Sequence, residues 1–214
     1  GDWSSDVCSS DLGRPRKAME EALDGGNGFN WLSHAPLDHL GLGMDRQTFR
    51  DAIALRMGVP LPDALPTACP SCGDPFDVAH ALKCKKGNWV KRRHDEVVRT
   101  WKALFKRISA TVQPEPYLSA PIGLKRKSTS KKEGARADIF ATGVFRPGQG
   151  AFFDVAVVDT GAEAHVHKKA LGVLREKEKS KRAKYEERAE LMGSTFAPLV
   201  CSVYGTLAPE AAKD

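Results

Sequence analysis

Three cysteines and one histidine lie within sixteen residues of this sequence, and their spacing limits how that stretch can fold. The pattern is Cys69-x2-Cys72-x7-His80-x3-Cys84. A tight turn can place the first two sulfurs on one metal ion, and one helical turn can do the same for the last two ligands. Three thiolates and one imidazole fill the tetrahedral shell of Zn²⁺ and leave no position for water. We therefore expect a structural zinc site; the alternative is three buried free cysteines beside a chance histidine.

The composition limits the class of protein. Of the 214 residues, 41% are apolar and 28% are charged, which is enough to bury a core in one or two domains. No apolar run approaches the ~18 residues that a membrane span needs, so a membrane span is excluded. The five cysteines are an odd number. Their clustering beside a histidine favours metal binding in a reducing, intracellular compartment over a disulfide framework.

The net charge of +6 is unevenly distributed. Residues 1–68 carry 6 basic and 10 acidic side chains, whereas residues 69–214 carry 27 basic and 17 acidic ones. Such a basic portion favours phosphate backbones as a partner. The residues that we expect to bind DNA are Lys85, Lys86, Lys91, Arg92, Arg93, Lys125, Arg126, Lys127, Lys131 and Lys132. For the second group, residues 125–132, the alternative is a solvated loop that only aids solubility.

The first twelve residues differ in character from the rest. Residues 2–12 read Asp-Trp-Ser-Ser-Asp-Val-Cys-Ser-Ser-Asp-Leu and have no hydrophobic periodicity. They match the in-frame translation of a common sequencing adapter, so we expect residues 1–12 to be an artefact rather than structure. The alternative is a natural, flexible, Ser-rich leader. An artefact here implies that the reading frame began upstream and that the chain is a fragment.

Three further segments follow. We expect residues 13–65 to form a connector with a short helix over 16–23 and a second helix over 44–57, which Gly58 and Pro60 end. Residues 66–86 hold the Cys-His motif. Residues 87–210 then give the order helix, three strands, helix, strand, which indicates an α/β fold.

Periodicity and turn residues place the elements of residues 87–210. The predicted helices are 88–108 and 166–192, and the predicted strands are 111–118, 136–145, 151–158 and 196–204. Pro114 and Pro116 indicate that the first of these strands is an edge strand. The sequence Arg-Pro-Gly-Gln-Gly after Phe145 predicts a hairpin turn between the second and third.

Two aspartates lie on the strands of that hairpin. Asp154 is embedded in the apolar run Ala-Phe-Phe-Asp-Val-Ala-Val-Val, where a carboxylate is costly unless it is paired or bound to a metal. Asp138 lies on the preceding strand. Two carboxylates on neighbouring strands supply the oxygen ligands that Mg²⁺-dependent phosphodiester hydrolysis requires. The alternatives are an edge-exposed Asp or a structural ion pair with Arg136.

Three more side chains are candidates for the same site. His94 falls on the apolar stripe of the helix over 88–108, so it is either a core histidine or a group at the site edge that positions substrate or a carboxylate. Lys181 and Tyr185 are four residues apart and share one helix face. The neighbouring pair Glu178 and Arg182 is expected to be an ordinary ion pair on a solvated face.

Together these motifs resemble the C-terminal region of site-specific non-LTR retrotransposon polyproteins. In that class a Cys-Cys-His-Cys knuckle and a restriction-like endonuclease follow a reverse transcriptase. The resemblance covers roughly residues 66–210. The matching motifs are Cys69-x2-Cys72-x7-His80-x3-Cys84, Arg93-His94-Asp95, Arg136-Ala137-Asp138, Phe153-Asp154-Val155 and Lys181-x3-Tyr185.

The resemblance implies a PD-(D/E)XK restriction-endonuclease-like core of helix, three strands, helix and strand. It assigns Asp138 and Asp154 as ligands of catalytic Mg²⁺. Because Ala156 stands where the family motif has lysine, it makes Lys181 the catalytic cation and has Tyr185 pack against or orient it. The activity implied is a nuclear DNA endonuclease that nicks target DNA to prime reverse transcription. The partners implied are DNA and the reverse transcriptase of the same polyprotein, with element RNA a further candidate. The alternatives are a catalytically decayed copy and a purely nucleic-acid-binding module.

Overall fold

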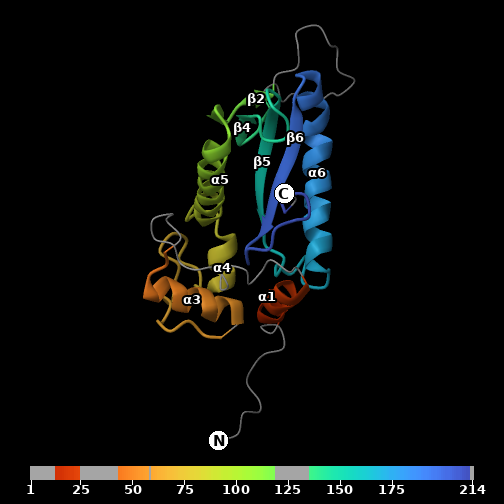
Figure 1. Ribbon diagram of the computed structural model, residues 1–214. Coiled ribbons are helices and arrows are strands. Elements are labelled where there is room, and N and C mark those ends of the chain that lie inside the picture. The colour runs from red at the N-terminus through yellow and green to blue at the C-terminus, as the bar shows by residue number, and fades with distance from the viewer. Residues whose placement is uncertain (1–12, 25–42, 58, 119–134, 213–214) are drawn as a thin grey trace, which may run out of the picture. The chain divides into compact units, whose positions relative to one another are not determined.

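The computed structural model describes residues 13–24, 43–57, 59–118 and 135–212. The chain divides into two compact units. Unit 1 comprises Gly1–Trp89, Val158–Leu174 and Ser202–Leu207, and unit 2 comprises Val90–Val157, Arg175–Cys201 and Ala208–Asp214. Each unit is therefore built from segments that are far apart in the sequence, and the colours of Figure 1 give the residue numbers of these segments.

Unit 2 is organised around a four-stranded sheet with the order β1-β4-β5-β6. The helices and strands of this part of the chain are α5 (Trp89–Ile108), β1 (Val112–Pro114), β2 (Tyr117–Leu118), β3 (Ala135–Arg136), β4 (Ile139–Thr142), β5 (Gly150–Val158), α6 (Ala170–Leu191) and β6 (Thr195–Ser202). β1 pairs with β4 and β4 pairs with β5, both antiparallel. Val203 N–H donates to the Val158 carbonyl, so β5 and β6 end side by side and run parallel. The sheet is mixed, and the predicted α/β class is confirmed.

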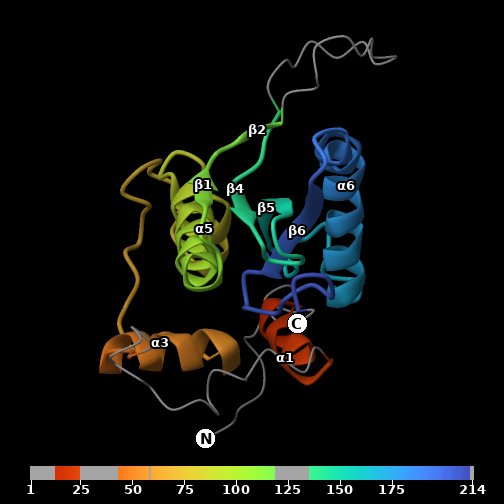
Figure 2. The same cartoon turned by 45° about the horizontal axis from the view of Figure 1, so that its top comes forward.

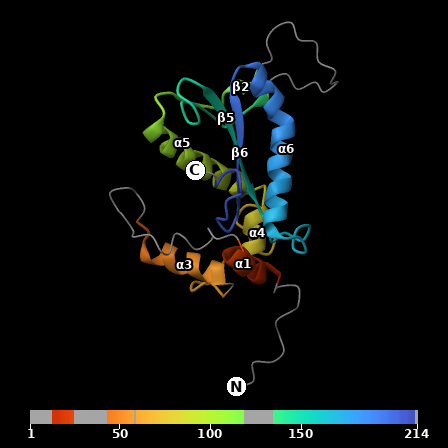
Figure 3. The ribbon, with the colours of Figure 1, turned by 45° about the vertical axis from the view of Figure 1, so that its right-hand side comes forward.

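Helices cover both faces of this sheet: α5 lies on one side and α6 on the other (Figure 2). α6 runs alongside β6 in the views of Figures 1 and 3. Strand alternation divides β5 between these faces, because successive side chains of a strand point to opposite sides. Phe153 packs on Phe105 of α5 with ring centroids 4.4 Å apart, whereas Phe152 joins the buried cluster of Tyr185 and Phe196.

The predicted strand over 111–118 is interrupted, as its two prolines predict. β1 pairs with β4 and β2 pairs with β3 in one continuous register, with Val112 opposite Ala141 and Tyr117 opposite Arg136. β1 is the edge strand of the sheet. The prediction of a Pro-interrupted edge strand is therefore confirmed.

A β-bulge begins β4. Ile139 lies opposite Phe153, and the N–H of Asp138 also donates to the Phe153 carbonyl at 3.0 Å. Two residues of one strand therefore oppose one residue of the next, which is the definition of a bulge. Bulges re-aim side chains and are frequent next to functional sites, and Asp138 is the extra residue of this one.

The predicted hairpin turn joins β4 to β5. Gln149 N–H donates to the Arg146 carbonyl at 3.1 Å, Pro147 occupies the second position and Gly148 has φ of 76°. This is the pattern of a type II turn, which needs a positive φ at its third residue. Strand β4 ends at Thr142 rather than at the predicted residue 145, because Gly143 also takes a positive φ and leaves the extended conformation.

Unit 1 contains α1 (Gly13–Asp24), α3 (Arg46–Met57) and α4 (Val78–Lys83). α1 packs against α3. Arg14 of α1 makes two hydrogen bonds to the Asp159 carboxylate, at 2.9 and 3.0 Å, and buried Glu21 accepts a hydrogen bond from Thr160. The helix in the segment expected to be a connector is thus held by charged contacts to the loop that follows β5.

Candidate metal centre and acidic site

A tight turn carries the first two cysteines. Cys69 N–H donates to the Asp74 carbonyl at 2.7 Å, and Gly73 N–H donates back to the Cys69 carbonyl at 2.9 Å. Gly73 has φ of 81°, a conformation that residues with a Cβ rarely adopt. An isolated bridge between Ala68 and Pro75 closes the loop. The sequence folds into this knuckle because glycine allows the chain to reverse directly behind Cys72.

Helix α4 carries the other two ligands. The Asp77 side chain caps the helix by accepting a hydrogen bond from His80 N–H, and Cys84 N–H donates to the His80 carbonyl at 2.8 Å. These bonds hold the histidine and the last cysteine one helical turn apart on one face. The expected helical presentation of the His-x3-Cys half is confirmed.

The four side chains converge. The ligand atoms of Cys69, Cys72, His80 and Cys84 all lie within 4.8 Å of one another. The Cys84 sulfur lies 3.9 Å from those of Cys69 and Cys72, and Cys72 Sγ lies 3.1 Å from His80 Nε2. A tetrahedral ion with Zn–S bonds of about 2.3 Å separates its sulfurs by about 3.8 Å, so the spacing suits Zn²⁺. The cysteines are free, and 3.9 Å is far longer than the ~2.05 Å of a disulfide.

The local hydrogen bonds prepare one thiol for a metal. Burial alone would raise the pKa of Cys69, but the N–H groups of Ser71 and Cys72 point at its sulfur and lower the pKa to about 6. Burial and the neighbouring thiols raise the pKa of Cys72 to about 12. Three close sulfurs cannot all become thiolates without a cation between them, which is the role a bound metal fills.

The second site is built around Asp154. Its position on β5 puts its side chain on the face of the sheet that α6 covers, where the residue is only 4% exposed. The Lys181 ammonium of α6 forms an ion pair with Asp154 Oδ2. A buried carboxylate needs a charged partner, and for Asp154 this partner is Lys181. The alternative partner, Arg136, pairs with Glu115 at 3.2 Å.

Asp138 has different partners. Its Oδ2 accepts a hydrogen bond from Val155 N–H at 2.7 Å and lies 3.4 Å from His94 Nε2. The hydrogen bond to Asp138 is the main reason why the pKa of His94 is raised to about 9, although burial opposes it. His94 thus reaches from α5 to the acidic site, a contact that favours the positioning role over that of a plain core histidine.

Tyr185 of α6 lies next to the acidic site. It is buried and packs on Phe196 with ring centroids 5.3 Å apart. Burial, followed by the charges of Asp154 and Asp138, raises the pKa of its phenol, so both carboxylates act on one hydroxyl. Lys184 donates to that hydroxyl at 2.5 Å. The sequence reasoning missed Lys184, although its position three residues after Lys181 places both on one helix face.

The carboxylates are not assembled with His94 into a metal-binding group. In the part of the chain that the structure describes, only the Cys-His set brings three or more His, Cys, Asp or Glu ligand atoms within 4.8 Å of one another. Asp154 lies on β5, whereas Asp138 lies between β3 and β4, directly before β4, and not on a strand as predicted. Each has a cationic side chain of its own, Lys181 for Asp154 and His94 for Asp138. The Mg²⁺ site therefore stays a prediction.

Only some of the predicted DNA-binding residues lie in the part of the chain that the structure describes. Lys85 and Lys86 are exposed directly after the last zinc ligand. Lys91 and Arg92 are exposed in the first turn of α5, and Arg93 beside them is partly buried. Five residues lie outside the described residues: Lys125, Arg126, Lys127, Lys131 and Lys132.

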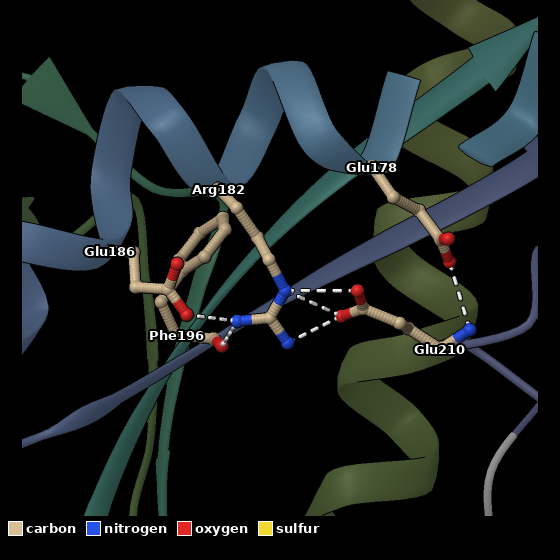
Figure 4. Close-up of polar contacts among 5 residues, drawn as sticks. All are labelled: Glu178, Arg182, Glu186, Phe196 and Glu210. Carbon is tan, nitrogen blue, oxygen red and sulfur yellow. Dashed lines mark hydrogen bonds and ion pairs between the residues drawn. The ribbon is translucent and has the colours of Figure 1, made fainter. Parts of the chain in front are cut away.

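The expectation of a solvated Glu178–Arg182 pair is wrong. Glu178 is 4% exposed and accepts a hydrogen bond from the Glu210 N–H at 2.9 Å, and burial raises its pKa. Arg182 Nε donates to both carboxylate oxygens of Glu210 at 2.9 Å, and its other end pairs with Glu186 (Figure 4). α6 therefore uses this charged face to hold the C-terminal turn, a long-range contact that helical spacing alone cannot reveal.

Comparison with known proteins adds no assignment. No protein-family model matches the chain. No curated protein matches it either. Among the described residues, no helix combines the length and apolar character that crossing a membrane demands. A function for this chain must be argued from the two sites themselves.

Proposed function

We propose that this chain is a metal-dependent DNA endonuclease domain preceded by a structural zinc knuckle. The observation that carries the proposal is the ion pair between Lys181 of α6 and the buried carboxylate of Asp154 on β5. Ala156 occupies the strand position where the PD-(D/E)XK motif has its lysine. A lysine that reaches the same carboxylate from the following helix supplies the missing cation.

The order of the elements supports a PD-(D/E)XK-like core. After α5, the four-stranded sheet takes three antiparallel strands, β1, β4 and β5, and then α6 and the parallel strand β6 follow, with one helix on each face of the sheet. Asp138 is the bulge residue directly before β4, and Asp154 lies at the middle of the neighbouring strand β5. An aspartate at the start of one strand and a second on its neighbour is the arrangement that this class of nuclease uses.

The acidic site offers the ligands for the chemistry. Asp138 and Asp154 would hold Mg²⁺, which when bound polarises the scissile phosphate and lowers the pKa of the attacking water. Lys181 would stabilise negative charge on the phosphoryl oxygens. Tyr185, held by Lys184, would keep Lys181 and Asp154 in place, and His94 would orient the Asp138 carboxylate.

The partners follow from this reading. DNA is the substrate, and the exposed basic side chains after the knuckle and in α5 contact its phosphates. In a site-specific non-LTR retrotransposon polyprotein the nick would prime reverse transcription in the nucleus. The reverse transcriptase of the same polyprotein and the element RNA would then be partners of this domain.

A second candidate is a nucleic-acid-binding zinc module whose nuclease site has decayed. The observation in its favour is the contrast between the two sites: the four zinc ligands converge, whereas each aspartate is already neutralised by a basic side chain. Such a protein would keep the knuckle and the basic surface and would not cut DNA.

Plasmid nicking separates the two candidates. The 214-residue chain should nick supercoiled plasmid with Mg²⁺ and not with EDTA. Asp154→Asn should lower the rate by about 100-fold or more, the usual effect of removing one such electrostatic contact. Glu96→Gln is the matched control, because Glu96 is exposed on α5 and pairs only with Arg99 among the contacts described. Binding without Mg²⁺-dependent nicking would favour the decayed module.

A further inference from the structure

A tyrosine and an arginine stack on each other beside the acidic site. Tyr117 of β2 and Arg136 of β3 are directly opposite in the antiparallel pair, and the Arg136 guanidinium lies 4.1 Å from the centre of the Tyr117 ring. Tyr117 is 53% exposed. The adjoining Leu118 is fully buried, whereas the Tyr117 ring is open to solvent. The ring therefore offers a flat apolar surface to a ligand.

Through Arg136, the stack lies close to Asp138 in the chain. Leu118 and Ala137 are buried in the cluster that Tyr185 joins under α6, so the alternate residues Tyr117 and Arg136 point to the opposite side. Asp138 follows Arg136 by two residues, so the two backbone positions lie no more than about 7 Å apart. A nucleotide bound at Asp138 therefore has the stack within reach of its neighbour.

The charge of the stack favours a base over a phosphate. Arg136 Nη1 donates to Glu115 Oε2 at 3.2 Å, so a carboxylate offsets the guanidinium charge. Glu115 has φ of 46°, a left-handed conformation that is uncommon for a residue with a side chain, and its N–H donates to the Asp138 carbonyl at 3.0 Å. The backbone thus holds Glu115 at this place, where its charge opposes an approaching phosphate.

We propose that the Tyr117–Arg136 stack binds one unpaired DNA base next to the phosphate that the acidic site addresses. Bases stack on tyrosine rings and on guanidinium planes regardless of sequence, so the site would take any base that is out of the duplex. The inference rests on the proposed function, because it places the base beside the scissile position. It adds a requirement that the aspartates do not impose: the DNA must be locally unpaired.

The test measures the affinity of the full chain for a fluorescent single-stranded oligonucleotide and for an abasic strand of the same length. Tyr117→Ala should weaken binding of the base-bearing strand by about 5- to 150-fold, the range for loss of one stacked base. It should leave the abasic strand unaffected and the salt dependence unchanged. Tyr117→Trp should bind at least as well as the parent. Phe145→Ala is the matched control, because Phe145 is an aromatic residue of equal exposure in the other hairpin.

The outcomes distinguish a failure of the proposed base site from a failure of the nuclease assignment. If Tyr117→Ala binds both strands like the parent, or weakens both equally, the base site is wrong even where plasmid nicking succeeds. If the base-specific loss appears and Asp154→Asn nicks like the parent, the base site stands and the nuclease assignment fails.

Discussion

At the scale of single residues, the apolar surroundings of Asp154 predict that its side chain has a charged partner. Asp154 is surrounded by apolar neighbours, and such a carboxylate must have a partner. The requirement was readable from the sequence, and so was the candidate Lys181. The sequence does not settle the identity of the partner, because it offers Arg136 as a second candidate; the geometry of α6 decides between them.

His94 should stabilise the fold only while it carries a proton. Its pKa is raised from 6.5 to about 9, mainly by the hydrogen bond to Asp138. A raised pKa in the folded state contributes stability that is complete below pH 6.5 and is lost as the pH rises through 9. We expect His94→Gln to cost about 1–2 kcal/mol of unfolding free energy at pH 6, after allowance for its partial exposure, and close to nothing at pH 10.

Urea unfolding of parent and variant at both pH values, with zinc present, measures this difference. An equal cost at pH 6 and pH 10 would show that His94 acts as a neutral packing residue and not through its charge. Asp95→Asn is a useful control, because Asp95 Oδ1 lies 3.3 Å from His94 Nδ1 and Asp95 is the weaker influence on the pKa of His94.

At the scale of elements, the zinc knuckle is the part in which sequence and geometry agree most closely. Its ligands are close in the chain, so local turns suffice to bring them together. We expect one zinc per chain by metal analysis and loss of that zinc in Cys84→Ser, because a site of three ligands binds far more weakly. Cys201→Ser is the matched control, since Cys201 is buried and lies in β6. Well under one zinc per parent chain would contradict the assignment.

The helices and strands with a marked apolar pattern are the ones that the sequence predicts most accurately. α5 begins one residue from its predicted start, and β5 and β6 lie within two residues of prediction, because an apolar stripe of period 3.6 marks α5 and short apolar runs mark the two buried strands. α6 begins at Ala170 and not at residue 166, since turns occupy 160–168. Contacts between segments that are distant in the chain cannot be predicted from local sequence patterns. Examples are the hydrogen bonds of Arg14 to Asp159 and of Arg182 to Glu210.

At the scale of the whole chain, the excess of positive charge after residue 68 predicts electrostatic DNA binding. For roughly 6–10 phosphate contacts, affinity should fall by about 10³ to 10⁵ between 50 and 200 mM salt. Replacing Lys131 and Lys132 by alanine should lower the slope of log Kd against log salt by about one for each lost contact. Fluorescence anisotropy with a labelled duplex measures the slope. A salt-insensitive affinity would point to a partner other than nucleic acid.

In the proposed nuclease, Lys181 should do from α6 what the lysine of the strand motif does in other PD-(D/E)XK enzymes, and a lysine exchange tests this role most directly. The measurement is the rate of Mg²⁺-dependent plasmid nicking by three chains: the parent, Lys181→Met, and Lys181→Met combined with Ala156→Lys. Ala156 is two residues from Asp154 and so lies on the same face of β5. We predict a loss of about 100-fold or more in the single variant and recovery of much of that rate when the lysine is returned to the strand. Nicking by Lys181→Met at the parental rate would contradict the account.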